Sequence, residues 1–212
     1  MATNSLGPAF IKLVYDECAR GLSSTGMRRR TRGIGTWQLA SGFLGWIGLN
    51  AATRSMNGTM VINANVGVVC EEIQKLIHLV EGAREKYEAF PTICMGIGYL
   101  MPTPTHREFI FRKESPVAPV VDELVDAVNK YGIPYVKAHC SLQSLVEPLD
   151  RLPRHAHWGD SSERLVALRY LMDGRSAAER TMNERRAEGQ RLSMNLTRFD
   201  AFCSLFIKYM DG

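Results

Sequence analysis

The side chains with the clearest chemistry are six arginines in a stretch that contains no carboxylate. No Asp or Glu lies between Glu17 and Glu71. The arginines in this stretch are Arg20, Arg28, Arg29, Arg30, Arg32 and Arg54. Residues 26–60 hold five of them, and the formal net charge of the whole chain is +4, so this one segment accounts for the positive excess. Guanidinium groups bind carboxylates and phosphates through paired N–H donors. The segment is therefore a candidate contact site for an anionic partner.

Three interpretations of this cluster are open. An acidic protein could dock on it, or a nucleic acid could bind through its phosphates and stack on Trp37 or Trp46. The third interpretation is an exposed edge strand whose basic side chains prevent unwanted strand pairing. The sequence pI of about 8.9 is low for a dedicated nucleic-acid-binding domain, which favours a protein partner. The residues that we predict to bind an acidic protein are Arg28, Arg29, Arg30, Arg32, Arg54 and Trp37.

The alternation of side chains along a strand predicts how the arginines divide. In an extended segment, Arg28, Arg30 and Arg32 point to one side and Arg29 to the other. We therefore expect three guanidinium groups on one face of the first strand.

Candidate catalytic and metal-binding groups are isolated from one another. His155 and His157 share one side of an extended segment and Asp160 could add an oxygen ligand. However, Asp160 is better placed as a helix N-cap, and no third His or Cys lies nearby. His139 directly precedes Cys140, but neighbouring side chains on a helix diverge by about 100°, so they cannot act as base and nucleophile. We predict no catalytic residue, cofactor or metal, and metal binding by the His155–His157 loop stays open.

A strand with small side chains keeps an enzyme as the alternative interpretation. We expect a strand over residues 92–101, and one of its faces carries Thr92, Cys94, Gly96 and Gly98. Such a face lets a helix or a ligand approach closely. A cleft there with His106, His139 or a buried carboxylate would indicate an active site, whereas a filled contact would argue against one.

Hydrophobic periodicity predicts the elements that position these residues. Strands are expected at 27–32, 36–41, 43–51, 60–68, 92–101 and 107–112, with Asn57–Gly58 as a tight turn between the third and the fourth. Helices are expected at 9–22, 69–84, 115–132, 142–149, 162–172, 176–189 and 199–210, and a short extended piece at 133–136.

This order predicts an α+β fold. It lacks the strand–helix alternation of a doubly wound parallel sheet. We expect a mostly antiparallel sheet of about five strands with helices on one face, plus an all-helical C-terminal extension. The predicted parts are an α+β domain over 1–136 and a helical region over 137–212 packed on it, which could form one continuous domain.

Composition indicates a globular cytoplasmic protein. The chain has 212 residues, of which 45% are apolar and 23% charged, values near the average for globular domains. Four of the five scattered cysteines lie at apolar positions, which predicts buried reduced thiols and a reducing compartment. No secretory signal and no apolar run near 20 residues is present, so neither export nor a membrane span is expected.

One segment carries a resemblance to a known group of proteins. The order of a helix, a basic strand, Trp-bearing strands and a strand ending at Val66–Gly67–Val68 precedes the sequence Gly98-Tyr99-Leu100-Met101-Pro102. This pattern, over about residues 8–150, resembles small bacterial α+β domains of unknown function, some of which are presumed toxin-immunity proteins. The resemblance implies a non-enzymatic module that neutralises a cognate bacterial toxin by binding it, and no catalytic motif transfers from it. Nuclease inhibitors tend to be acidic, so the basic segment here indicates an acidic target.

Overall fold

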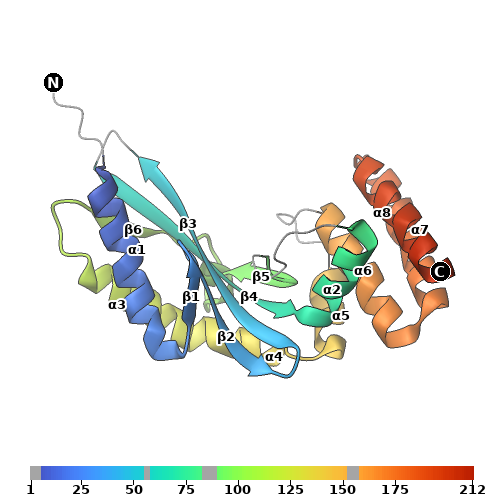
Figure 1. The fold of residues 1–212 in the computed structure, drawn as a ribbon. Coiled ribbons are helices and arrows are strands. Elements are labelled where there is room, and N and C mark those ends of the chain that lie inside the picture. Colours follow the sequence, from blue (N-terminus) through green and yellow to red (C-terminus); the bar gives the residue numbers. More distant parts are fainter. Residues whose placement is uncertain (1–5, 55–57, 83–89, 152–157) are drawn as a thin grey trace. The chain divides into compact units, whose positions relative to one another are not determined.

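The computed structural model describes residues 6–54, 58–82, 90–151 and 158–212, apart from the side chains of residues 53, 54 and 158–160. It confirms the predicted α+β class, with an antiparallel sheet followed by C-terminal helices (Figure 1). The chain divides into two compact units. The sheet unit comprises Met1–Ala40, Leu44–Val68 and Cys94–Ala138, and the helical unit comprises Ser41–Phe43, Val69–Ile93 and His139–Gly212.

The sheet is built from strands that follow one another in the chain. The strands are β1 (Arg28–Thr31), β2 (Ile34–Ala40), β3 (Phe43–Arg54), β4 (Thr59–Cys70), β5 (Ile93–Gly96) and β6 (Phe109–Arg112). Their order is β1-β2-β3-β4-β5, and β6 pairs antiparallel with β4, with Thr59 opposite Arg112. The predicted turn at Asn57–Gly58 lies largely outside the described residues, although β3 and β4 are neighbours as expected and Gly58 has a positive φ of 57°.

Two tryptophan rings pack directly on glycines of β3. Every residue from Leu44 to Leu49 is buried, as expected for a central strand. A Cβ atom at Gly45 would lie 2.2 Å from the Trp37 ring, and one at Gly48 would lie 2.1 Å from the Trp46 ring. Glycine is required at both positions because the rings occupy the space of a side chain. Trp37 and Trp46 are consequently part of the core, with 9% and 7% of their surface exposed.

Two helices of the sheet unit pack side by side. These are α1 (Pro8–Leu22) and α3 (Ala118–Ala127). They approach closely at Gly21, where a Cβ atom would lie 2.7 Å from the Val121 side chain. The core of this pair includes Val14, Cys18 and Leu124, all fully buried.

The segment after α3 remains helical, so the predicted extended piece at 133–136 is wrong. A π-helical turn (Val128–Gly132) continues into α4 (Ile133–Ala138). Gly132, which the sequence pattern suggests as a stop, is buried in this turn, and a Cβ atom there would lie 3.0 Å from Val66. The wider turn thus accommodates the glycine against β4 without ending the helix.

The predicted strand at 92–101 is shorter in the structure. β5 ends at Gly96 and a 3₁₀ turn covers Ile97–Leu100. A Cβ atom at Gly98 would lie 2.3 Å from the carbonyl oxygen of Thr105. The chain therefore folds back on itself at this glycine, and the close approach predicted for the small-sided face is made by its own backbone.

The helical unit contains α2 (Glu71–Glu81), α5 (Leu142–Asp150), α6 (Trp158–Asp173), α7 (Arg175–Arg191) and α8 (Thr197–Asp211). The apolar side of α2 buries Ile73, Leu76 and Val80, and α2 packs against α6 and α8. This arrangement differs from the predicted division after residue 136, because α2 belongs with the C-terminal helices. None of the described helices is long and apolar enough to cross a membrane.

The cysteines are reduced, and three of them are buried. Cys18, Cys70 and Cys203 lie in the core, Cys140 is half-buried, and Cys94 is exposed. The prediction of four buried thiols is therefore too high. Burial raises the pKa of the Cys18 thiol to about 12 and that of Cys203 to about 11.

Candidate functional site: the arginine cluster of β1

β1 lies at the edge of the sheet, and all four of its residues are exposed. It pairs with β2 in an antiparallel register that places Arg28 opposite Thr36 and Arg29 opposite Gly35. The register shifts between Arg29 and Thr31, as at a β-bulge or a local irregularity of the ladder. Within the described part of the chain, no strand pairs with the outer edge of β1.

Two of the arginines are held on helix α1. The Nη1 atom of Arg29 donates to Oδ1 of Asp16 at 2.6 Å. The guanidinium carbon of Arg32 lies 4.9 Å from the centre of the Tyr15 ring, which is cation–π geometry. The prediction that Arg32 shares a side with Arg28 and Arg30 is therefore wrong. The strand ends at Thr31, and Arg32 forms a turn with Gly33, whose φ is 80°, so the alternation does not reach it.

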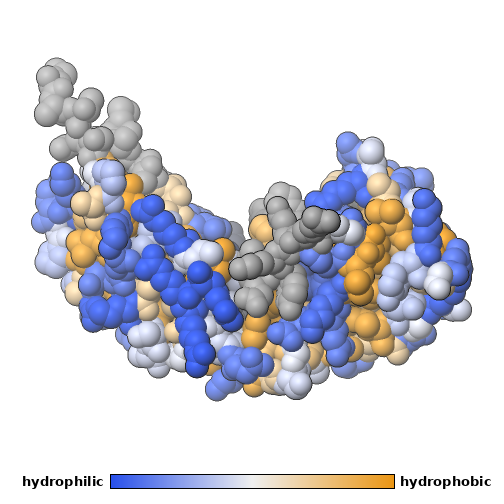
Figure 2. All heavy atoms as spheres, in the orientation of Figure 1, coloured by the Kyte–Doolittle hydropathy of each residue, from blue (hydrophilic) through white to orange (hydrophobic). Residues whose placement is uncertain are grey.

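Arg28 and Arg30 lie on the other side of β1. The Nε atom of Arg30 donates to Oγ1 of Thr36 at 2.8 Å, and Thr36 is only 1% exposed. The buried hydroxyl of Thr36 thus holds the Nε end of the guanidinium group of Arg30, whose side chain is exposed. Arg28 is the ladder partner of the same threonine, and it makes no ion pair with a described residue. Strongly hydrophilic residues gather on the surface over α1 and β1 (Figure 2).

The carboxylates that form ion pairs with these arginines come from α1. Hydrogen bonds from Lys12 and then from Arg29 hold the pKa of Asp16 below its ordinary value. Burial raises the pKa of Tyr15, and the nearby Arg32 charge opposes that rise. Arg20, also on α1, pairs with Glu17. The sequence between Glu17 and Glu71 has no carboxylate, but the folded cluster does have one nearby. Helix α1 lies beside β1 and brings Asp16 to Arg29.

Four of the six predicted partner-binding residues come together. Arg28, Arg29, Arg30 and Arg32 are all exposed around β1. Trp37 does not join this surface, because its ring packs on Gly45. Arg54 is the last residue of β3, and its side chain lies outside the described part of the structure.

The space beneath β1 is too small for a ligand. The cavity between Tyr15, Met27 and Arg29 has a volume of about 10 Å³, which is room for one water molecule at most. Recognition at this site would therefore involve the exposed side chains and the strand edge, not a pocket.

The groups considered for an active site are not brought together. His106 is exposed, with its Nε2 atom 3.7 Å from Oε1 of Glu108, and His139 belongs to the helical unit. No group of three or more metal-ligating side chains occurs in the described ranges. His155 and His157 lie outside them, and Asp160 is the third residue of α6, not its N-cap.

Comparison of the chain with protein-family models, with curated proteins and with solved structures found no match. The resemblance to presumed immunity proteins stays a prediction.

Proposed function

We propose that this chain is a protein-binding module that takes an acidic, extended segment of a partner protein along the edge of β1. The observation that carries the proposal is an exposed edge strand in which Arg28, Arg29 and Arg30 are consecutive. An edge strand offers backbone N–H and C=O groups, so an extended segment can add to the sheet as a further strand. The arginines then select carboxylates on that segment.

The packing of the tryptophans favours a protein over a single-stranded nucleic acid. Binding of single strands relies on exposed aromatic rings as stacking surfaces. Trp37 of β2 and Trp46 of β3 are both buried against glycines of β3.

The edge position also serves the simpler role of preventing aggregation. Basic side chains and a bulge both discourage pairing with another edge. The two roles are compatible. Basic side chains that discourage pairing with neutral or basic strand edges still attract the carboxylates of an acidic segment. The two roles differ in outcome, because only the binding role predicts a specific, salt-sensitive complex.

The biological form of the proposal is an immunity-type protein whose acidic partner is a cognate bacterial toxin. The resemblance over residues 8–150 and the basic character of β1 support it. The product of a neighbouring gene is the partner to try first, and a complex that survives only at low salt is the expected behaviour.

Charge reversal of Arg28 and Arg30, on the side of β1 away from α1, tests the binding role. The variant is Arg28→Glu with Arg30→Glu, and the matched control is Arg112→Glu with Lys113→Glu, two exposed residues at and after β6. Both variants carry the same charge change. However, β6 pairs with β4, and β2 and β3 separate β4 from β1 in the strand order. Binding of a fluorescent peptide with alternating Glu and Val is measured by anisotropy at two salt concentrations.

We expect the β1 variant to weaken peptide binding by at least about fivefold, as two lost charge contacts predict, and the control to bind like the parent protein. Equal loss in both variants would show that net charge alone is responsible. Tighter binding of a single-stranded oligonucleotide than of the peptide would favour the nucleic-acid alternative. Absence of any salt-sensitive binding would leave only the anti-aggregation role.

A further inference from the structure

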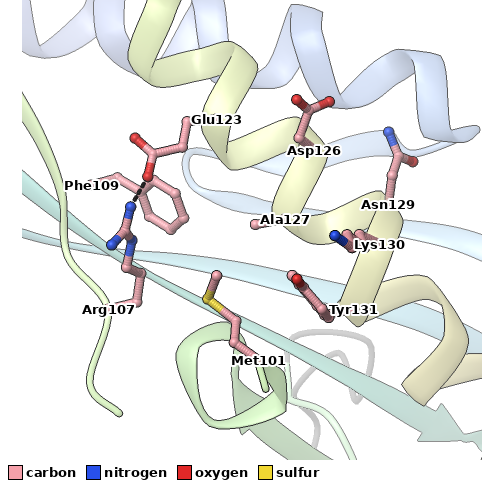
Figure 3. Close-up of a pocket in the computed structure, with 9 residues that line it drawn as sticks. All are labelled: Met101, Arg107, Phe109, Glu123, Asp126, Ala127, Asn129, Lys130 and Tyr131. Atoms are coloured by element: carbon pink, nitrogen blue, oxygen red, sulfur yellow. Dashed lines mark hydrogen bonds and ion pairs between the residues drawn. The ribbon is translucent and has the colours of Figure 1, made fainter. Parts of the chain in front are cut away.

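The sheet unit carries a groove with a volume of about 540 Å³ (Figure 3). This volume lies within the range of small-molecule sites. The groove is bounded by α3 and its π-helical turn on one side and by the segment that leads into β6 on the other. None of its lining residues belongs to the arginine cluster of β1, so it constitutes a separate candidate site.

The inner wall of the groove is apolar. Phe109 is the first residue of β6, and its ring is almost fully buried. Ala127, the last residue of α3, and Met101 complete this wall. Because Phe109 is almost fully buried, it forms the floor of the groove, and the half-buried Met101 is the more accessible part of this wall.

The π-helical turn places a cation and a ring together at the groove. Lys130 and Tyr131 lie in this turn, and the Nζ atom of Lys130 is 5.4 Å from the centre of the Tyr131 ring. Asp126 precedes Lys130 by four residues, the spacing that forms ion pairs on an α-helix, yet the two make no ion pair in the described structure. A π-turn is wider and shifts the following residues around the axis. The side chains of Lys130 and Asp126 point in different directions in Figure 3, although both line the groove.

Four charged residues line the groove, namely Arg107, Lys130, Glu123 and Asp126. Arg107, on the opposite side, pairs with Glu123 of α3, so these two charges neutralise each other. Lys130 is exposed, and its ammonium group has no carboxylate partner among the described residues. π-Turns are frequent at functional sites, and in this one Gly132 packs against Val66.

We infer that this groove binds a small aromatic carboxylate, with the ring between Met101 and Tyr131 and the carboxylate on Lys130. The apolar wall accounts for the ring. One available ammonium group accounts for one negative charge. A ligand with several charges, such as a nucleotide, would require further free cations, and Arg107 is already paired.

The probe for this site is 2-naphthoate, with the uncharged 2-naphthylmethanol as its matched ligand control. Binding is measured at neutral pH by titration with ligand-observed NMR on the full chain. The variants are Lys130→Gln, which removes the charge, and Ala127→Leu, which adds bulk to the apolar wall of the groove. Lys113→Gln is the control, because Lys113 is an exposed lysine of the same unit outside the groove.

We expect saturable binding of 2-naphthoate to the parent protein and weaker binding of the alcohol. Lys130→Gln should reduce naphthoate affinity by about fivefold, the upper range for an exposed charge contact, and leave the alcohol unchanged. Ala127→Leu should abolish both, and Lys113→Gln should change neither. The Lys130→Gln result decides the matter even where Ala127→Leu fails to fold.

Three results would overturn the inference: no saturable binding, equal affinity for acid and alcohol, or equal losses in Lys130→Gln and Lys113→Gln. The β1 variant Arg28→Glu with Arg30→Glu should bind naphthoate normally. Failure at this groove and failure of the proposed peptide binding are therefore separate outcomes.

Discussion

Asp16 competes with any anionic partner for Arg29. The two side chains form an ion pair across α1 and β1, and both are partly exposed. Arg32 is similarly occupied by the Tyr15 ring. At the residue scale, the cluster therefore consists of Arg28 and Arg30 on one side of β1, where Arg30 is bonded to Thr36, and two arginines that a partner must share with α1.

Replacing Asp16 with Asn should strengthen binding of the acidic peptide. The change releases Arg29 and removes a negative charge from the site. We expect an increase in affinity of about twofold to fivefold, as for loss of one exposed ion pair, measured by the same anisotropy titration. Glu17→Gln is the matched control, since Glu17 pairs with Arg20 on α1 and not with β1. An equal gain from both substitutions would show a general charge effect.

The ion pair between Asp16 and Arg29 should also make the stability of the protein depend on pH. The folded protein holds the pKa of Asp16 below its ordinary value of 3.8. A depressed folded pKa means that the stabilisation is fully present above pH 3.8 and is lost as the pH falls through the lower, folded value. Thermal unfolding of the parent and of Asp16→Asn should therefore differ slightly at neutral pH and converge below pH 3.8. A difference that persists in stronger acid would contradict this assignment.

At the element scale, Gly98 determines how the segment between β5 and β6 folds. Ala at this position would bring its Cβ within 2.3 Å of a backbone oxygen, which cannot move as a side-chain end can. We expect Gly98→Ala to reduce the free energy of unfolding by about 1–3 kcal/mol, the usual cost of overpacking, as measured by urea denaturation.

Gly96→Ala supplies the comparison within the same segment. A Cβ atom there would lie 3.2 Å from the ring of Tyr99, which is exposed and can shift. It should cost clearly less than Gly98→Ala. If the two variants were equally stable, the contact between Gly98 and Thr105 would not constrain the fold.

These elements also show what the sequence could predict. The strict alternation from Met60 to Val68 identified β4, because one of its faces is buried throughout. The 3₁₀ turn after Gly96 and the π-turn after Ala127 were not predicted, since each depends on a contact with a distant residue: Thr105 for Gly98, and Val66 for Gly132.

The candidate site was predictable to the same extent. Composition identified the arginines and the missing carboxylates, and an exposed edge strand was one of three interpretations of that segment. It did not reveal that Asp16 and Tyr15 would reach β1, because that depends on how α1 packs. The groove was missed altogether, since its residues come from separate stretches that no local pattern connects.

At the scale of the whole molecule, the helical unit is not a simple C-terminal domain. Its α5–α8 helices lie after residue 138, but α2 comes from between β4 and β5. Within this unit, the buried Arg185 joins α7 to the end of α5 by donating to the carbonyl oxygens of Leu149 and Asp150 at 3.1 and 2.9 Å. Such contacts hold the C-terminal helices together, but they do not cover the faces of α6 and α8 that α2 occupies.

A fragment of residues 139–212 should therefore fail to fold cooperatively. It lacks Ile73, Leu76 and Val80 of α2, all buried in the full chain, and burial of three such side chains contributes about 5–9 kcal/mol. That loss is comparable to the entire stability of a small domain. Thermal unfolding followed by circular dichroism should show a broad transition for the fragment, and a sharper one after addition of a peptide of residues 69–93. The same peptide with Leu76→Asp should have no effect, because a carboxylate cannot replace the buried leucine. A sharp transition in the fragment alone would show that α5–α8 form a complete core without α2.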